Sequence, residues 1–173
     1  MVSSPASEPA NEPETVTSGK QFTVQKVVSG GQRGVDRAAL DVAFELGLPC
    51  GGWCPQGRKA EDGPIATRYP LKETPSDDYS ERTEWNVRDS DGTLVLTRDD
   101  PTEGTAFTIE HAARLRKPCL VVDLSDKPSV SIVRAWVKDS HIRVLNVAGP
   151  RESKCPGIYV HACQFLRKAL SAG

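Results

Sequence analysis

The chain of 173 residues has a formal net charge of −1, with 38% hydrophobic and 26% charged residues, which is an ordinary composition for a water-soluble domain. This near-neutral balance offers no extended basic surface to nucleic acid or to an anionic membrane, so any anion site must be local. No apolar run approaches the roughly 20 residues of a membrane span, and the N-terminus lacks the charged and apolar regions of a secretory signal. We therefore expect a cytoplasmic protein.

Residues 1–20 are rich in Ser, Pro, Glu and Thr and contain almost no large apolar side chains. Such a segment cannot bury enough surface to offset the entropy of ordering, so it is predicted to be a disordered tail before one domain over 21–173. The chain has five cysteines, and an odd number in a chain of this length argues against a disulfide framework. Cys50 and Cys54 have no second pair to complete a typical zinc site, and no metal ligand is assigned.

Strand and helix patterns alternate along the rest of the chain. Expected strands, in chain order, cover 22–28, 50–53, 93–97, 119–123 and 142–147. Expected helices cover 34–46, 80–87, 104–116 and 129–138, and a last helix begins at Pro156. Within the first helix, Val35, Ala39, Val42, Ala43 and Leu46 form one apolar face, and within the last, Ile158, Ala162, Phe165, Leu166 and Ala169 do the same. Ser80 is expected to cap the second helix.

Strands that are apolar on both faces and alternate with helices indicate a parallel sheet covered on both sides. The predicted fold class is therefore α/β, a Rossmann-like three-layer sandwich with a mainly parallel sheet of about five strands. In such sheets ligands bind beyond the carboxyl ends of the strands. The loops at these ends are thus the candidate site.

The loop after the first strand reads SGGQRGVD. Its glycines allow close approach of the backbone to a ligand, and free N–H groups at a helix start favour negative charge. An arginine adds a bidentate phosphate partner. A tight turn without a ligand is the alternative. The candidate ligand-binding residues from this loop are Gly30, Gly31, Gln32, Arg33, Gly34 and Asp36.

Two further loops have a similar composition. After the third strand, Gly104 and Thr105 open a helix, where the threonine could cap the helix or donate to a ligand. After the last strand come Gly149, Arg151 and Ser153, which combine a glycine, a cation and a hydroxyl. Because the fold brings the strand ends to one rim, we expect the three loops to converge.

Other segments are less specific. Arg58 and Lys59 could form a cationic wall or belong to a solvated loop, and Arg151 and Lys154 could be plain surface charges. The run from Tyr79 to Trp85 could line a pocket for a flat ring or simply pack beneath a loop.

Five blocks of the sequence resemble the molybdenum-cofactor carrier family. They are SGGQRGVDRAALDVA at 29–43, GGWCPQGRKAEDGPI at 51–65, the run at 74–97, GTAFTIEHA at 104–112 and NVAGPRESKCPGIY at 146–159. This family is similar to a circularly permuted branch of the Rossmann-like superfamily that includes the LOG enzymes and DNA-processing protein A. The resemblance implies that the chain binds and protects molybdopterin without catalysis, passes it to molybdoenzymes and forms homo-oligomers, often tetramers. One departure is Arg33, where the family commonly has Thr.

Two other functions remain open from the sequence. A sensor of a nucleotide derivative such as AMP or ADP-ribose would use the same phosphate loops. A LOG-type nucleotide phosphoribohydrolase requires a catalytic glutamate, but this chain has Thr108 at the corresponding position, and threonine cannot replace that carboxylate. Glu110, two residues further on, is expected to point about 200° away around the helix.

Overall fold

The computed structural model describes residues 23–172. The tail predicted over 1–20 and Phe22, where the first strand was expected to begin, lie outside this range. The described strands are β1 (Lys26–Val28), β2 (Cys50–Gly51), β3 (Trp53–Cys54), β4 (Lys72–Glu73), β5 (Gly92–Thr97), β6 (Cys119–Asp123) and β7 (Val144–Ala148). The described helices are α1 (Val35–Leu46), α2 (Tyr79–Arg88), α3 (Glu103–Arg114), α4 (Ser131–Asp139) and α5 (Ile158–Leu170), with short 3-10 turns at Gln56–Arg58 and Leu124–Asp126.

The main sheet has five strands in the order β2-β1-β7-β5-β6, and every pair in it is parallel. The last strand of the chain, β7, therefore lies in the middle, between β1 and β5. If β7 is counted first, followed by β1, β2, β5 and β6, the order becomes 3-2-1-4-5, which is that of a doubly wound nucleotide-binding fold. The topology is thus that of a Rossmann-like sheet whose first strand has moved to the end of the chain.

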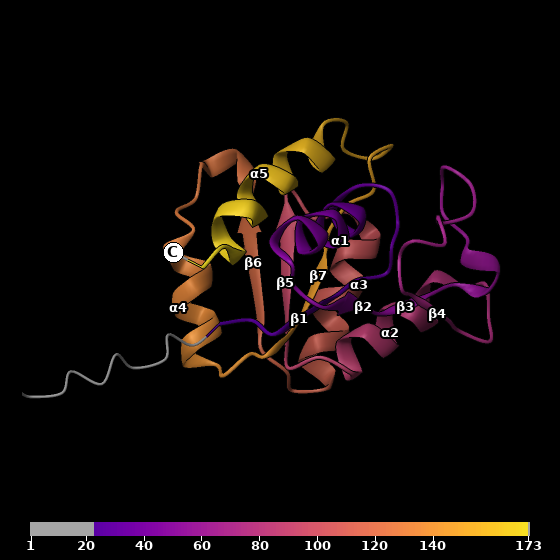
Figure 1. Cartoon of the computed structure of the whole chain (residues 1–173), viewed down its shortest axis with the longest axis horizontal. Coiled ribbons are helices and arrows are strands. Elements are labelled where there is room, and N and C mark those ends of the chain that lie inside the picture. The colour runs from indigo at the N-terminus through magenta and orange to yellow at the C-terminus, as the bar shows by residue number, and fades with distance from the viewer. Residues whose placement is uncertain (1–22, 173) are drawn as a thin grey trace, which may run out of the picture.

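Helices cover both faces of this sheet, as Figure 1 shows. The helices α1, α4 and α5 pack on one face, and α2 and α3 lie on the other. This arrangement confirms the predicted α/β fold with its parallel sheet of five strands.

The main hydrophobic core lies between the sheet and the face made by α1, α4 and α5. Leu94 and Leu96 of β5 and Leu145 of β7 are fully buried there in the core that they share with α1 and α5. The apolar faces predicted for the first and last helices are confirmed, because all their residues are buried except Leu46, which is partly buried against the same core. Burial of a side chain such as Leu94 stabilises the fold by about 1.5–3 kcal/mol.

The opposite face of the sheet is more polar. Thr93, Thr97 and Asn146 point away from the main core, and all three are buried, at 0%, 3% and 3% exposure. The Asn146 amide donates to the Thr93 hydroxyl at 3.2 Å, which satisfies both groups within the fold. This polar face, beneath α2 and α3, forms the floor of the candidate site.

The strand expected over 50–53 is instead two short strands in different sheets. Gly52, at φ 127°, turns the chain between β2 and β3, and a Cβ there would lie 2.3 Å from the Ser29 carbonyl oxygen. β3 then pairs with β4, so the long connection to α2 contains a small parallel sheet of its own. Only glycine permits this sharp change of direction against the first loop.

Two helix starts also differ from expectation. Asp78, not Ser80, caps α2, and its carboxylate accepts from the Ser80 N–H at 2.9 Å. Thr102 caps α3, and Thr105 lies inside the helix with its N–H directed at the Thr102 hydroxyl, 3.4 Å away. The caps fall two and three residues earlier because an extended residue with an oxygen side chain was available there.

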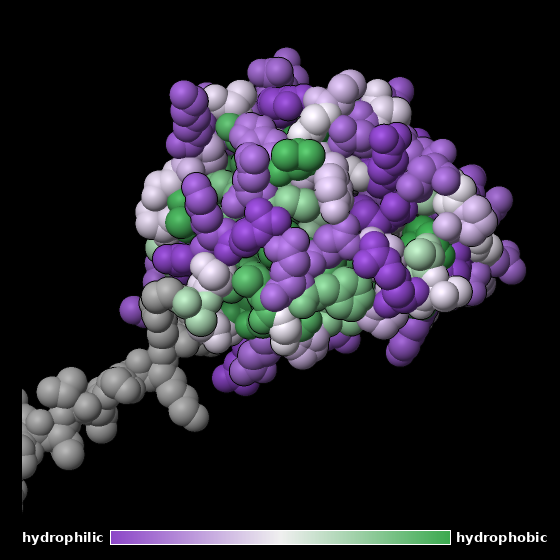
Figure 2. All heavy atoms as spheres, turned by 45° about the horizontal axis from the view of Figure 1, so that its top comes forward, coloured by the Kyte–Doolittle hydropathy of each residue, from purple (hydrophilic) through white to green (hydrophobic). Residues whose placement is uncertain are grey.

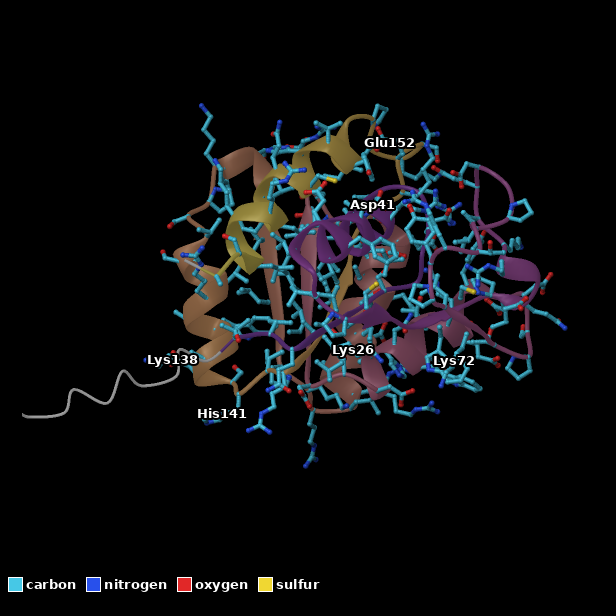
Figure 3. All side chains as sticks on the ribbon, in the orientation of Figure 1. Lys26, Asp41, Lys72, Lys138, His141 and Glu152 are labelled. Atoms are coloured by element: carbon cyan, nitrogen blue, oxygen red, sulfur yellow. The ribbon has the colours of Figure 1, made fainter. Side chains whose placement is uncertain are left out.

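Outside the main core, a smaller apolar cluster attaches the long connection to α1. Tyr69 is buried in it, and its hydroxyl donates to Asp41 at 2.6 Å, while the Tyr159 hydroxyl of α5 donates to the other oxygen of Asp41 at 2.5 Å. Asp41, labelled on α1 in Figure 3, therefore joins three segments of the chain. No helix among residues 23–172 is long and apolar enough to cross a membrane.

Candidate functional site

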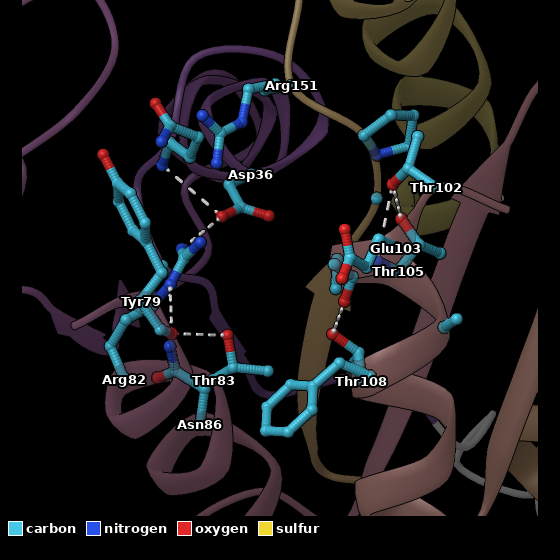
Figure 4. A pocket seen from close by; sticks show the side chains of 18 of the residues that line it. Asp36, Tyr79, Arg82, Thr83, Asn86, Thr102, Glu103, Thr105, Thr108 and Arg151 are labelled. Atoms are coloured by element: carbon cyan, nitrogen blue, oxygen red, sulfur yellow. Dashed lines mark hydrogen bonds and ion pairs between the residues drawn. The ribbon is translucent and has the colours of Figure 1, made fainter. Parts of the chain in front are cut away.

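A cavity of about 770 Å³ opens at the carboxyl ends of β1, β5 and β7. Its walls come from the loop after β1, from α2, from the first half of α3 and from the loop after β7 (Figure 4). In the sheet order this is the switch point, because β7 and β1 lead to α5 and α1 on one face and the neighbouring β5 leads to α3 on the other. The volume lies within the range of about 300–1,000 Å³ that is typical of small-molecule sites.

Seven of the eleven residues predicted for the site line this cavity. They are Gly30, Gln32, Asp36, Gly104, Thr105, Gly149 and Arg151. The fold therefore brings all three predicted loops to one place, although they are far apart in the sequence. Figure 2, which turns the carboxyl edge of the sheet toward the viewer, shows mainly hydrophilic residues there.

The other four predicted residues lie outside the cavity lining. A Cβ on Gly31 would lie 2.5 Å from Leu71, and one on Gly34 would lie 2.5 Å from the Pro150 carbonyl oxygen, so both glycines serve close packing. The Ser153 hydroxyl donates to Glu61 and is thus not free for a ligand.

Arg33 is exposed. The hydrogen bond from Arg37 is the main cause that lowers the pKa of Asp62, and the charge of Arg33 makes a smaller contribution, so Arg33 lies near that carboxyl group. Its guanidinium therefore faces the outer surface and not the cavity.

The N–H groups of the first loop are partly occupied: within the described residues those of Gly30 and Gly34 have no protein acceptor, whereas others in the loop do. The Gln32 N–H donates to Asp36 at 3.4 Å, the Arg33 N–H to the Gln32 side chain at 3.1 Å, and the Val35 N–H to the Pro150 carbonyl at 3.3 Å. Of the side chains of this loop, Asp36 is paired with Arg82, and Gln32 keeps one donor, Nε2, without a partner in the described protein.

The start of α3 also has free N–H groups. Within the part of the chain that the structure describes, the N–H groups of Glu103 and Gly104 have no protein acceptor. A Cβ added at Gly104 would meet nothing within 4 Å, so the helix start is open to the cavity. A helix N-terminus of this kind favours a bound anion.

A buried ion pair joins α2 to the first loop. Arg82 Nη1 donates to Asp36 Oδ2 at 2.7 Å, and the two side chains are 12% and 7% exposed. Burial raises the pKa of Asp36 above its ordinary value, and the positive charge of Arg82 opposes this rise. Gly30 is required beside the pair, because a Cβ there would lie 1.6 Å from Arg82 Nη1.

Sequence reasoning missed Arg82, although it considered the run from Tyr79 to Trp85. The Tyr79 ring lies between cations from three segments: Lys59 Nζ at 4.8 Å, Arg151 Cζ at 5.1 Å and Arg82 Cζ at 5.4 Å from its centroid. Tyr79 and Arg82 line the cavity, and so does Lys154. A cationic residue one helical turn from an aromatic residue at a helix start was the available signal.

The two residues of the predicted cationic wall have different roles. Arg58 donates to the carbonyl oxygens of Ile65, Ala66, Tyr69 and Leu71, so it shapes the loop between β3 and β4. Lys59 is exposed and stacks on Tyr79 at the mouth of the cavity.

Two polar residues of α3 concern the hydrolase alternative. Thr108 lines the cavity, and its hydroxyl donates to the Gly104 carbonyl at 3.1 Å. Glu110 also reaches the cavity lining, contrary to the expectation that it points away, and it forms an ion pair with Arg114 at 2.8 Å on the exposed side of the helix. Glu103 is a further carboxylate of this wall that sequence reasoning did not select.

Comparison with known proteins places this geometry in a family. A family model described as the circularly permutated YpsA SLOG family matches residues 27–170, which is nearly all of the described chain. The chain belongs to this family. The permutation in the family's description agrees with the central position of β7 in the sheet.

A solved structure is similar over almost its whole length. It is the crystal structure of "Putative molybdenum carrier protein" from Syntrophus aciditrophicus SB, with 45% sequence identity and a TM-score of 0.83. The match covers 86% of this chain and 96% of that one. A comparison with curated proteins found no match.

Proposed function

We propose that this SLOG-family protein binds molybdenum cofactor in the cavity at the strand ends, protects it and passes it to molybdoenzymes without catalysing a reaction. The observation that carries the proposal is a cavity lined by the cations Arg82, Arg151 and Lys154, with neither cysteine nor histidine among the described residues that line it. The proposal is supported by the 45% identity to a protein described as a molybdenum carrier. We further propose that the protein is cytoplasmic and assembles into a homo-oligomer, for example a tetramer.

The chemistry of the lining suits this cargo. The cofactor carries a phosphate, which Arg151 and the open start of α3 would bind. Its pterin ring needs flat contacts and polar partners, which Phe107 and the hydroxyl oxygen of Thr83 offer in the cavity. Its molybdenum is held by dithiolene sulfurs, and a lining without a thiol or an imidazole does not compete for the metal.

The cysteines of the chain lie apart from this lining. All five are free thiols, and burial raises the pKa of Cys50, Cys54, Cys119 and Cys163. The thiol form therefore dominates at neutral pH, and thiols are much weaker metal ligands than thiolates.

The decisive test is to purify the full chain from a host that makes molybdenum cofactor. Acid oxidation should release a fluorescent pterin in a near-stoichiometric amount, and metal analysis should find molybdenum with it. Arg151→Ala should reduce the retained pterin, whereas Lys138→Ala, on α4 far from the Glu152 loop in Figure 3, should not. Protein that is folded but free of pterin from such a host would contradict the proposal.

A further inference from the structure

The cavity has two places that favour an anion, and they lie on different walls. One is the start of α3, with the free N–H groups of Glu103 and Gly104. The other is the group of cations around Tyr79, to which Arg151 contributes from the loop after β7. Figure 4 shows Arg151 and Tyr79 across the cavity from Thr102 and Thr105, which mark the helix start. A single phosphate would occupy only one of these places.

The cations at the second place are not all balanced by carboxylates. Arg82 is neutralised by Asp36, but Arg151 has no ion pair within residues 23–172, and neither has Lys154, a further cation of the cavity lining. Lys59 approaches the same ring from the loop after β3. The pKa of Asp78 is lowered chiefly by hydrogen bonds from Ser80, and the charge of Lys59 makes a smaller contribution. Positive charges that the fold brings close together repel one another, and a bound anion between them would reduce this repulsion. The gathering therefore points to a ligand with more than one negative charge.

Gln32 provides an independent sign of a ligand. Its side chain is part of the lining, the residue is 5% exposed, and its Nε2 has no partner in the described protein. The orientation of the amide is set, because its Oε1 accepts from the N–H groups of both Arg33 and Glu61. A buried donor without an acceptor is unfavourable, and an oxygen of a ligand in the cavity would supply the missing acceptor.

We infer that the cavity binds a diphosphate-bridged ligand, in which two ring systems are joined through two phosphates, in preference to a phosphate monoester. This inference rests on the proposed function and specifies the form of the ligand. One phosphate lies at the start of α3, and the other lies between Arg151 and Lys154. Glu103 opposes the first phosphate with its own charge, so its removal should strengthen binding.

The volume of the cavity is large enough for a diphosphate-bridged ligand. A space of about 770 Å³ is in the upper part of the range for small-molecule sites and leaves room for a second ring system beside a pterin. The same chemistry would come from a pterin dinucleotide or from an adenine compound such as ADP-ribose. The two sources share the diphosphate and differ in the ring.

The first experiment compares diphosphate and monophosphate probes by calorimetry on the full chain. The pairs are inorganic diphosphate against inorganic phosphate, and ADP-ribose against AMP. At least one diphosphate should bind ten times or more tightly than its monophosphate partner. Arg151→Ala combined with Lys154→Ala should remove most of this preference, Lys138→Ala should retain it, and Glu103→Gln should increase the diphosphate affinity several-fold.

Three results would overturn the inference. They are equal affinity within both pairs, equal loss of both affinities in the Arg151→Ala, Lys154→Ala variant, and no binding of either diphosphate to protein that thermal melting shows to be folded. Mass spectrometry of the ligand that copurifies from a host making both pterin forms separates the inference from the proposed function. Retention of only the pterin monophosphate supports the carrier and overturns the inference. ADP-ribose binding by protein that retains no pterin supports the inference and overturns the carrier.

Discussion

The guanidinium of Arg82 donates to the carboxylate of Asp36 across 46 positions of sequence, at 2.7 Å. This contact attaches α2 to the loop after β1, and it places a neutral pair in the wall of the cavity. Removal of one partner would leave a charge with little access to water. The pair therefore couples the stability of the fold to the shape of the site.

Arg82→Met should destabilise the folded protein by about 3 kcal/mol at pH 7, because it leaves the Asp36 carboxylate buried without its partner. Burial already raises the pKa of Asp36, and loss of Arg82 should raise it further. Protonation then removes the unpaired charge, so the destabilisation should be smaller at pH 4 than at pH 7. Urea unfolding at the two pH values measures this, with Arg88→Met, on the exposed side of the same helix, as the control. Equal destabilisation at both pH values would refute the account.

Gly30→Ala should act through the same ion pair. The new Cβ would meet Arg82 Nη1 at 1.6 Å and Cζ at 2.6 Å, so the guanidinium must leave Asp36. The loss of stability should be similar to that of Arg82→Met, and the two changes together should cost much less than their sum, since both remove one interaction. Gly104→Ala, where a Cβ has open space, is the matched control and should leave the stability nearly unchanged. Additive effects in this double-mutant cycle would show that Gly30 acts in some other way.

Arg151→Ala and Arg33→Ala should differ in their effect on the bound ligand. Arg151 lines the cavity and would make a charge-assisted contact with phosphate, so its loss should weaken binding about tenfold or more. Arg33 is exposed near Asp62, and its loss should weaken binding by less than about threefold through long-range charge alone. Equilibrium dialysis of the pterin, or calorimetry with ADP-ribose, measures both variants. A larger effect of Arg33→Ala would return the anion site to the first loop.

Tyr69 should make the protein sensitive to alkaline pH. Burial, followed by the hydrogen bond to Asp41, raises the pKa of Tyr69 from 10.0 to about 12. Because the folded pKa exceeds the unfolded one, the stabilisation is fully present below about pH 10 and is lost as the pH rises through about 12. Tyr69→Phe should therefore be less stable than the parent at pH 8, by about 1 kcal/mol, and this difference should shrink toward pH 12. Thermal melting across this pH range, followed together with phenolate absorbance, would detect the opposite trend if the assignment is wrong.

The sequence by itself determined the parts that depend on local pattern. Apolar periodicity placed the helix faces that carry Val35 and Ile158, and apolar strands alternating with helices required a parallel sheet covered on both sides. Glycines after strands marked the loops that meet at the cavity, because only the carboxyl ends of parallel strands share one edge. Five blocks of residues also indicated the family, because their order and spacing are specific to it.

The tertiary structure alone decided how those loops are used. Insertion of β7 between β1 and β5 is a matter of long-range pairing, and it set which loops face one another. The N–H groups of Gln32 and Val35 in the first loop are taken by Asp36 and Pro150, and the helix start at Gly104 offers further open N–H groups to the cavity. Arg33 turned outward, while Arg82 reached the site from α2. Side-chain direction and the fate of each backbone donor depend on neighbours distant in sequence, and no local pattern encodes them.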